Sequence, residues 1–316
     1  MVIAPGTSLD VPVRFAPTTP GAKSATITIN TNDPVTPNKV ATLTALTPDA
    51  ELCNAPSFTS VGMSIGPTFG SSKTGAYTFT GQGRNLVPFG DKHTFGFQTQ
   101  GEYLYYHGRH EGQIDAGVMN RWKRVQFGVF ANFKYLSMGQ FKDGGVLGQG
   151  SAVLDLLFST VRVNIFGSRA FKDVAVLGED TTLTFATAPA AGSTAVATRV
   201  ENVARATSTL GGGLQVGVGP TTELEGNVMW LRREQPTALS DGVGAFGRVT
   251  YHVSDRFALF GEGTLNETYL GPTNSGRVVF AFIFGRWARP GDLANKHTPL
   301  GLDVPRVHFD LQTRTR

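Results

Sequence analysis

Residues 125–135 read Val-Gln-Phe-Gly-Val-Phe-Ala-Asn-Phe-Lys-Tyr, and this stretch decides the fold class. Its odd-numbered positions are all apolar, whereas Gln126, Gly128, Asn132 and Lys134 hold even-numbered positions. Successive side chains of a β-strand point to opposite faces, so the segment predicts a strand with one apolar and one polar face. A single strand of this kind fits a soluble sandwich as well as a membrane barrel. The number, length and connections of the other strands have to decide.

The same alternation recurs along the chain and gives twelve candidate strands, with ten as the alternative count. The candidates are 58–70, 75–86, 92–107, 110–122, 124–137, 147–159, 160–172, 203–218, 222–233, 241–253, 256–268 and 276–288. Connections after even-numbered candidates are tight, as at residues 122–124 and 254–256, and those after odd-numbered ones are mostly longer. Short turns at one end and long loops at the other are typical of outer-membrane barrels, whose short turns face the periplasm.

We therefore expect an all-β chain in which residues 58–288 form an antiparallel transmembrane β-barrel. This part resembles bacterial outer-membrane β-barrel proteins in general, which implies a place in the bacterial outer membrane. An even strand count predicts that both termini are periplasmic. The composition agrees, because 40% hydrophobic residues and a mean hydropathy of -0.08 suit a wall with one lipid-facing and one polar face.

Charge and cysteine content exclude several other classes. Lys and Arg number 28 against 24 Asp and Glu, too even a balance to predict a nucleic-acid partner. The single Cys53 rules out an intramolecular disulfide framework and a cysteine-rich zinc site. We expect no cofactor and no metal.

The N-terminal region differs from the barrel. Strand-like runs cover residues 9–15, 24–29 and 40–44. The motifs Val-Pro-Val-Arg-Phe-Ala-Pro (11–17), Pro20-Gly21 and Ile-Thr-Ile-Asn-Thr-Asn-Asp-Pro (27–34) resemble the second half of immunoglobulin-like domains of the ASPM/SPD-2/hydin type. The resemblance implies a seven-stranded β-sandwich that serves as an extracytoplasmic or interaction module. Its first strands are missing, so we expect a domain truncated at its N-terminus, with a signal peptide lost upstream; the alternative is a short strand-rich arm.

The expected organisation therefore has four parts. A partial immunoglobulin-like domain covers residues 1–50, a linker 51–57, the barrel 58–288 and a periplasmic tail 289–316. Outer-membrane lipid and lipopolysaccharide are the expected partners, and a periplasmic protein could dock on the N-terminal domain or on the tail.

Inward-facing polar residues and aromatic residues at strand ends are the candidate site residues. The lumen-facing candidates are Arg84, Glu102, Asp115, Arg121, Lys134, Asp155, Arg162, Glu223, Glu225, Arg248, Glu262 and Arg277. The expected aromatic girdles are Tyr103, Tyr105, Trp230 and Tyr269 at the outer rim, and Trp122, Tyr251, Phe257 and Trp287 at the periplasmic rim. The lumenal set holds equal numbers of acids and bases, which favours a weakly selective pore or a self-neutralised interior.

Three functions remain open at this stage. The first is a weakly selective channel for small hydrophilic solutes. The second is a non-conducting anchor that displays a periplasmic immunoglobulin-like domain. The third, a lipid-active outer-membrane enzyme, is disfavoured because none of the six His residues is expected mid-strand on the lipid face beside a Ser. We therefore expect no enzymatic activity. The run 173–202 is expected to be a surface loop or an inward-folding plug.

Overall fold

The computed structural model describes residues 21–31, 34–35, 37–47, 57–69, 77–90, 94–106, 108–139, 141, 143–185, 195–233, 241–266, 276–285 and 299–315. The chain divides into two compact units, Met1–Ala55 and Pro56–Arg316. Among the described residues, no helix is long and apolar enough to cross a membrane.

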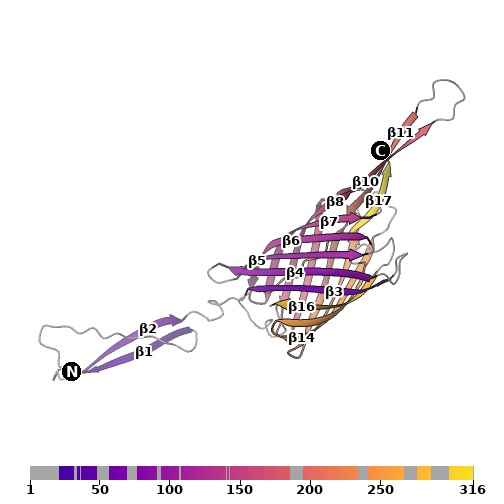
Figure 1. The fold of residues 1–316 in the computed structure, drawn as a ribbon. Coiled ribbons are helices and arrows are strands. Elements are labelled where there is room, and N and C mark those ends of the chain that lie inside the picture. Colours follow the sequence, from indigo (N-terminus) through magenta and orange to yellow (C-terminus); the bar gives the residue numbers. More distant parts are fainter. Residues whose placement is uncertain are drawn as a thin grey trace. The chain divides into compact units, whose positions relative to one another are not determined.

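The second unit is a closed antiparallel barrel of twelve strands (Figure 1). Its strands are β3 (Phe58–Phe69), β4 (Tyr77–Phe89), β5 (Phe95–Tyr106), β6 (Arg109–Trp122), β7 (Val125–Met138), β8 (Gly144–Leu157), β9 (Val161–Lys172), β12 (Ser208–Val218), β13 (Thr222–Arg232), β14 (Gly242–Ser254), β15 (Phe257–Leu265) and β16 (Gly276–Gly285). Sequence neighbours pair, and β16 with β3 and β9 with β12 complete the ring. The predicted all-β class, the antiparallel barrel and the count of twelve are confirmed, and the alternative of ten is wrong.

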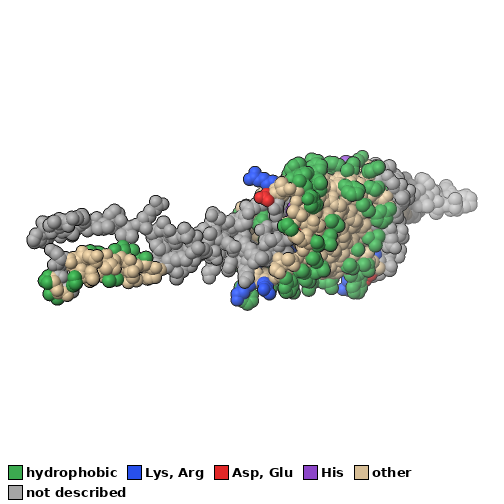
Figure 2. Space-filling model, turned by 90° about the horizontal axis from the view of Figure 1, so that it is seen from below, with side chains coloured by type: hydrophobic (Ala, Val, Ile, Leu, Met, Phe, Trp, Pro, Cys, Tyr) green, Lys and Arg blue, Asp and Glu red, His purple; other side chains and the backbone are tan. Residues whose placement is uncertain are grey.

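Alternation along each strand builds the barrel wall. In β7 the apolar side chains named in the sequence, such as Phe127 and Phe133, are exposed, whereas Gln126, Asn132 and Lys134 are buried. The space-filling view shows hydrophobic side chains over much of the outer wall and charged ones near its two ends (Figure 2). A polar inside and an apolar outside reverse the arrangement of a water-soluble barrel.

The two ends of the barrel differ in their connections. At one end, here called the tight-turn end, strands join through residues 90–94, 123–124, 158–160, 219–221 and 255–256. The opposite end, called the long-loop end, carries the remaining connections. Lys123 has a φ of 55°, because a two-residue hairpin turn needs a left-handed residue. The predicted asymmetry holds for most connections; the exception is the short connection 107–108 between β5 and β6 at the long-loop end.

A second sheet stands at the long-loop end. The stretch expected to be a loop, 173–202, contains most of a hairpin of β10 (Val174–Phe185) and β11 (Ala195–Ala206). The C-terminal strand β17 (Phe309–Thr315) adds to β11 in antiparallel register, with Phe309 opposite Ala206 and Thr315 opposite Val200. We call β10, β11 and β17 the outer sheet; Figure 1 shows it extending beyond the barrel.

In the first unit, β1 (Gly21–Asn30) pairs with β2 (Asn38–Thr47). These strands contain the predicted runs 24–29 and 40–44, while the run 9–15 lies outside the described residues. Ile29 and Val40 are exposed on this hairpin. A two-stranded hairpin buries too little apolar surface for independent stability.

Candidate functional site: the lumen and the segment inside it

The structure places all twelve lumen-facing candidates on the inner face of the barrel wall. Eight of them are buried: Asp115, Arg121, Lys134, Asp155, Arg162, Glu223, Glu262 and Arg277. The other four, Arg84, Glu102, Glu225 and Arg248, are half-buried and line the cavity described below. Successive side chains of a strand point to opposite faces, and these residues all lie on the inner face. Strand periodicity was therefore enough to predict them.

These charges pair with one another inside the barrel. Arg162 Nη2 lies 2.6 Å from Asp155 Oδ2, and Lys134 Nζ lies 2.7 Å from Glu111 Oε2. Glu262 accepts from two bases, with Arg248 Nη2 at 2.7 Å and Arg277 Nη2 at 3.2 Å. A buried charge is tolerated when it is paired and hydrogen-bonded. The acids and bases of the lumen meet this condition by forming these ion pairs with one another.

The tail is part of this site. Residues 299–308, which we call the lumenal segment, run through the interior of the barrel, and Leu300, Leu302 and Val307 are fully or almost fully buried there. The expectation of a tail outside the barrel on the periplasmic side is therefore wrong for these residues. The boundary drawn at residue 288 does not separate the tail from the barrel, because residues 299–315 pack on its inner face and on β11.

Amide side chains of the wall hold the backbone of the lumenal segment. Gln98 makes two hydrogen bonds to Leu302: its Nε2 donates to the carbonyl oxygen and its Oε1 accepts from the N–H, both at 2.8 Å. The N–H groups of Leu300 and Val307 donate to Oε1 of Gln126 and Gln113, at 3.1 Å and 2.9 Å respectively. A glutamine side chain offers both a donor and an acceptor, so it can replace the neighbouring strand that an extended backbone otherwise needs.

Cations of the wall complete the backbone contacts. Arg162 Nη2 donates to the carbonyl oxygen of Gly301 at 2.8 Å. Lys134 Nζ donates to the carbonyl oxygen of Val307 at 3.0 Å. Gly301 and Val307 are both buried, and a buried carbonyl group without a hydrogen-bond partner would be costly.

Two charged side chains of the lumenal segment bind opposite charges of the wall. Asp303 Oδ1 lies 2.8 Å from Arg84 Nη2, and its Oδ2 lies 3.3 Å from Arg162 Nη1. Arg306 donates twice to Glu102, through Nε at 2.5 Å and Nη2 at 2.6 Å. Bidentate pairs of this kind fix geometry as well as charge.

An apolar layer lies inside the lumen beneath these polar contacts. Leu300 and Leu302 belong to a buried cluster with wall residues Phe58, Leu86, Met119, Phe130, Val153, Leu157, Phe166, Met229 and Leu231. Gly128 makes room for the segment, since a Cβ at this position would collide with Leu302 Cδ1. Inward-facing apolar residues were not expected in a polar lumen; they are there because they pack against the leucines of the tail.

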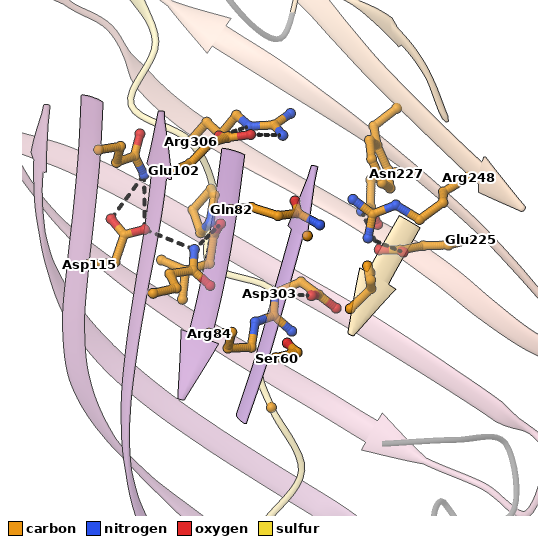
Figure 3. Close-up of a pocket in the computed structure, with 18 of the residues that line it drawn as sticks. Ser60, Gln82, Arg84, Glu102, Asp115, Glu225, Asn227, Arg248, Asp303 and Arg306 are labelled. Carbon is orange, nitrogen blue, oxygen red and sulfur yellow. Dashed lines mark hydrogen bonds and ion pairs between the residues drawn. The ribbon is translucent and has the colours of Figure 1, made fainter. Parts of the chain in front are cut away.

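A polar cavity of about 210 Å³ remains beside the lumenal segment. One side is formed by Asp303 and Arg306 of the segment, and the other by wall residues that include Ser60, Gln82, Glu225, Asn227 and Arg248 (Figure 3). Arg248 Nη1 lies 3.8 Å from Glu225 Oε2, and Asn227 Nδ2 donates to Glu225 Oε1 at 3.3 Å. Charges of both signs therefore line the space.

Aromatic side chains mark both ends of the outer wall. Tyr103, Tyr105 and Trp230 are exposed toward the long-loop end, and Trp122 and Tyr251 toward the tight-turn end. Phe257 is half-buried at the tight-turn end and stacks near Phe284, with ring centroids 4.9 Å apart. The remaining two predicted girdle residues, Tyr269 and Trp287, lie outside the described residues.

Groups suited to catalysis or metal binding are engaged otherwise. His252 is buried in the lumen with Nε2 3.0 Å from Glu223 Oε1, and it does not face lipid. His110 Nδ1 contacts the hydroxyl of Tyr103, whereas Glu111 faces inward to Lys134. No group of three His, Cys, Asp or Glu side chains in the described part of the chain could hold a metal ion.

The residues of the tail that fill the lumen were not among the predicted site residues. Asp303, Arg306 and the buried leucines of the tail were assigned to a peripheral segment because three prolines interrupt residues 289–316. One signal was present: Leu300, Leu302 and Val304 alternate with Gly301 and Asp303, a period-two pattern like that of the strands. Its short length made it easy to overlook.

Comparison with known proteins adds only distant likenesses. No protein-family model matches the chain, and no curated protein matches it. Among solved structures, it is similar to the KdgM porin, with 9% identity, a TM-score of 0.42 and coverage of 71% of this chain and 98% of that one. It is also similar to the Pseudomonas putida toluene transporter TodX, with 8% identity, a TM-score of 0.43 and coverage of 76% and 94%. The NanC porin gives 7% identity, a TM-score of 0.44 and coverage of 71% and 98%.

Proposed function

We propose that this chain is a bacterial outer-membrane β-barrel that acts as a narrow, weakly selective channel for small hydrophilic solutes. The observation that carries the proposal is the polar cavity beside the lumenal segment, inside a barrel whose outer face is apolar. A twelve-stranded barrel encloses more space than an eight-stranded one, whose interior is filled by its own side chains. The lumenal segment occupies part of that space and leaves the cavity beside it, which would form the narrowest part of the pathway.

The membrane location rests on the outer wall. Phe280, Phe282 and Phe284 are exposed on β16, while the intervening Ala281 is buried. A contiguous apolar exterior of this extent is unfavourable in water, and a closed barrel leaves no strand edge unpaired in lipid. Lipid and lipopolysaccharide are the partners that this exterior would contact. The tight-turn end would face the periplasm.

Weak selectivity follows from the charges along the cavity. Arg84 lies beside Asp303 and Arg248 beside Glu225 along its lining, so neither sign dominates (Figure 3). A pore that prefers one ion sign carries rings of like charge. The expected substrates are therefore small polar solutes rather than one kind of ion.

Planar-bilayer recording of the purified full chain tests the channel. We expect small conductance steps with little preference between cations and anions. Arg248→Gln should shift the reversal potential in a salt gradient toward cation selectivity, because Glu225 and Glu262 lose a positive neighbour. The control Arg124→Gln, on the exposed tight turn, should leave selectivity unchanged. A flat trace across the voltage range, together with no solute uptake into liposomes, would sink the proposal.

The second candidate is a non-conducting membrane anchor, and the lumenal segment favours it. A filled interior is what an anchor needs, and the segment covers the inner face of β5. We propose that the N-terminal unit, which resembles half of an immunoglobulin-like domain, is then the part that binds a periplasmic protein. A folded barrel that conducts nothing but retains a partner through residues 1–50 would support this reading.

A further inference from the structure

We propose that the barrel carries its own residues 299–308 across the membrane and holds the following strand β17 on the side of the long loops. This inference rests on the membrane location proposed above and is independent of conduction. Its basis is the path of the chain: β16 ends at the tight-turn end, whereas the lumenal segment leads to β17 at the long-loop end.

The contacts of the lumenal segment define its direction. Leu300 and Gly301 contact Gln126 and Arg162, each the second residue of a strand that starts at the tight-turn end. At its other end, the His308 carbonyl oxygen accepts from the N–H of Thr207, in the connection between β11 and β12. The segment therefore enters at the tight turns and leaves at the long loops.

Between these ends the segment follows β5 step by step. Leu302 contacts Gln98, Val304 contacts Gln100 and Arg306 contacts Glu102, so two residues of the segment match two residues of the strand. This register describes an extended chain parallel to β5. At about 3.3 Å per residue, residues 300–308 extend about 26 Å along β5; with a strand tilt of about 40° this covers about 20 Å of an apolar band that is about 25 Å tall.

The wall is shaped for a resident extended chain. Most of its polar contacts go to backbone groups of the segment, which any sequence would supply, while Asp303 and Arg306 fix the register by ion pairs. Gly128 leaves the space that Leu302 fills. Two independent features, hydrogen bonding and shape, thus point to the same path.

The last part of the path, the second half of β17, has side chains suited to contact with water. At the start of β17, Phe309 packs with Val307, Leu136 and Leu147, and the buried Asp310 pairs with Arg233 at 2.6 Å. From Gln312 onward its residues are polar, and Arg314 donates through Nε to Glu201 Oε2 at 2.5 Å. Arg199, two residues before Glu201 on β11, is exposed and forms a hydrogen bond with Glu179 on β10. This hydrogen bond raises the pKa of Arg199. Pairing with β11 anchors the end of the chain outside the rim.

Cysteine accessibility in cells tests the inference. In a full-length Cys53→Ser background, single cysteines are introduced by Thr315→Cys on β17, Asp241→Cys at the long-loop end and Arg124→Cys in a tight turn. All three positions are exposed. Intact and permeabilised cells are then treated with a membrane-impermeant maleimide, after heat-modifiable gel mobility has shown that each variant is folded.

We expect the cysteine at 315 to be labelled like the one at 241 and unlike the one at 124, whichever way the barrel is inserted. Labelling of 315 together with 124 would overturn the inference while leaving the membrane-spanning barrel intact. Equal labelling of 241 and 124 in intact cells would instead refute the membrane location itself, and this inference with it. A channel that fails to conduct has no bearing on any of these readouts.

Discussion

Arg162 illustrates how single residues hold the lumen together. Its guanidinium binds Asp155 of the wall, Asp303 of the lumenal segment and the Gly301 carbonyl oxygen. Asp155 in turn accepts from Gln126 at 2.7 Å. One side chain thereby joins β8, β9 and the tail, and a planar guanidinium is suited to such multiple contacts.

Removing one partner of this pair should destabilise the barrel. Asp155→Ala leaves the buried Arg162 without its nearest carboxylate, and breaking a buried pair costs about 3 kcal/mol. The free energy of unfolding from urea titrations in detergent or vesicles measures the effect. Asp180→Ala, at an exposed position of β10, is the matched control and should change it by less than about 0.5 kcal/mol. Equal effects of the two substitutions would show that the pair contributes no stability.

At the scale of elements, the strands of the wall and the lumenal segment depend on each other. The apolar inner residues of β6, β7 and β9, such as Met119, Phe130 and Phe166, have Leu300 and Leu302 as packing partners. An extended segment cannot satisfy its own backbone groups, so it needs the glutamines of β5, β6 and β7.

Filling the space at Gly128 should loosen the segment. Gly128→Val would crowd Leu302, and overpacking costs about 1 to 3 kcal/mol. Opening of the segment should then become about tenfold more frequent or more, so tryptic cleavage after Arg306 should accelerate by that factor. Gly112→Val on β6, where a Cβ meets open space, is the control. Unchanged cleavage in a folded Gly128→Val barrel would contradict the packing described here.

At the scale of the whole molecule, the barrel has charged residues inside and apolar residues outside, the reverse of a water-soluble protein. The inner charges are paired, and the outer aromatic residues lie near the two ends. Such an arrangement is stable only where lipid replaces water around the wall.

A charge on the outer wall should therefore cost more at mid-height than at a rim. Phe280→Arg places a cation in the middle of β16 and should lower the free energy of unfolding in phospholipid vesicles by about 2 to 4 kcal/mol. Val253→Arg, near the tight-turn end of β14, should cost about 1 kcal/mol or less. Both positions are exposed in the wild type, so burial does not explain a difference. Similar losses at both heights would argue against a bilayer around this wall.

The sequence determined the barrel because strand periodicity is a local property. Alternation within residues 125–135 assigns each side chain to a face without reference to any other strand. The twelve strands and the inward position of residues such as Arg248 and Glu262 follow from that rule. The contrast between turns such as 123–124 and the longer loops is equally readable from the chain.

Only the tertiary structure decided where residues 299–315 go and what fills the lumen. The contacts of Leu302 with Gln98 and of Arg306 with Glu102 each join residues 204 positions apart, and no local pattern encodes such a pairing. Nor did the sequence predict that β10 and β11 form a hairpin, or that β11 pairs with β17. Closure of the barrel creates an interior lined by amide side chains, paired charges and an apolar layer. No single strand has such an interior, and the lumenal segment fits it because its backbone, charged side chains and leucines match these three features.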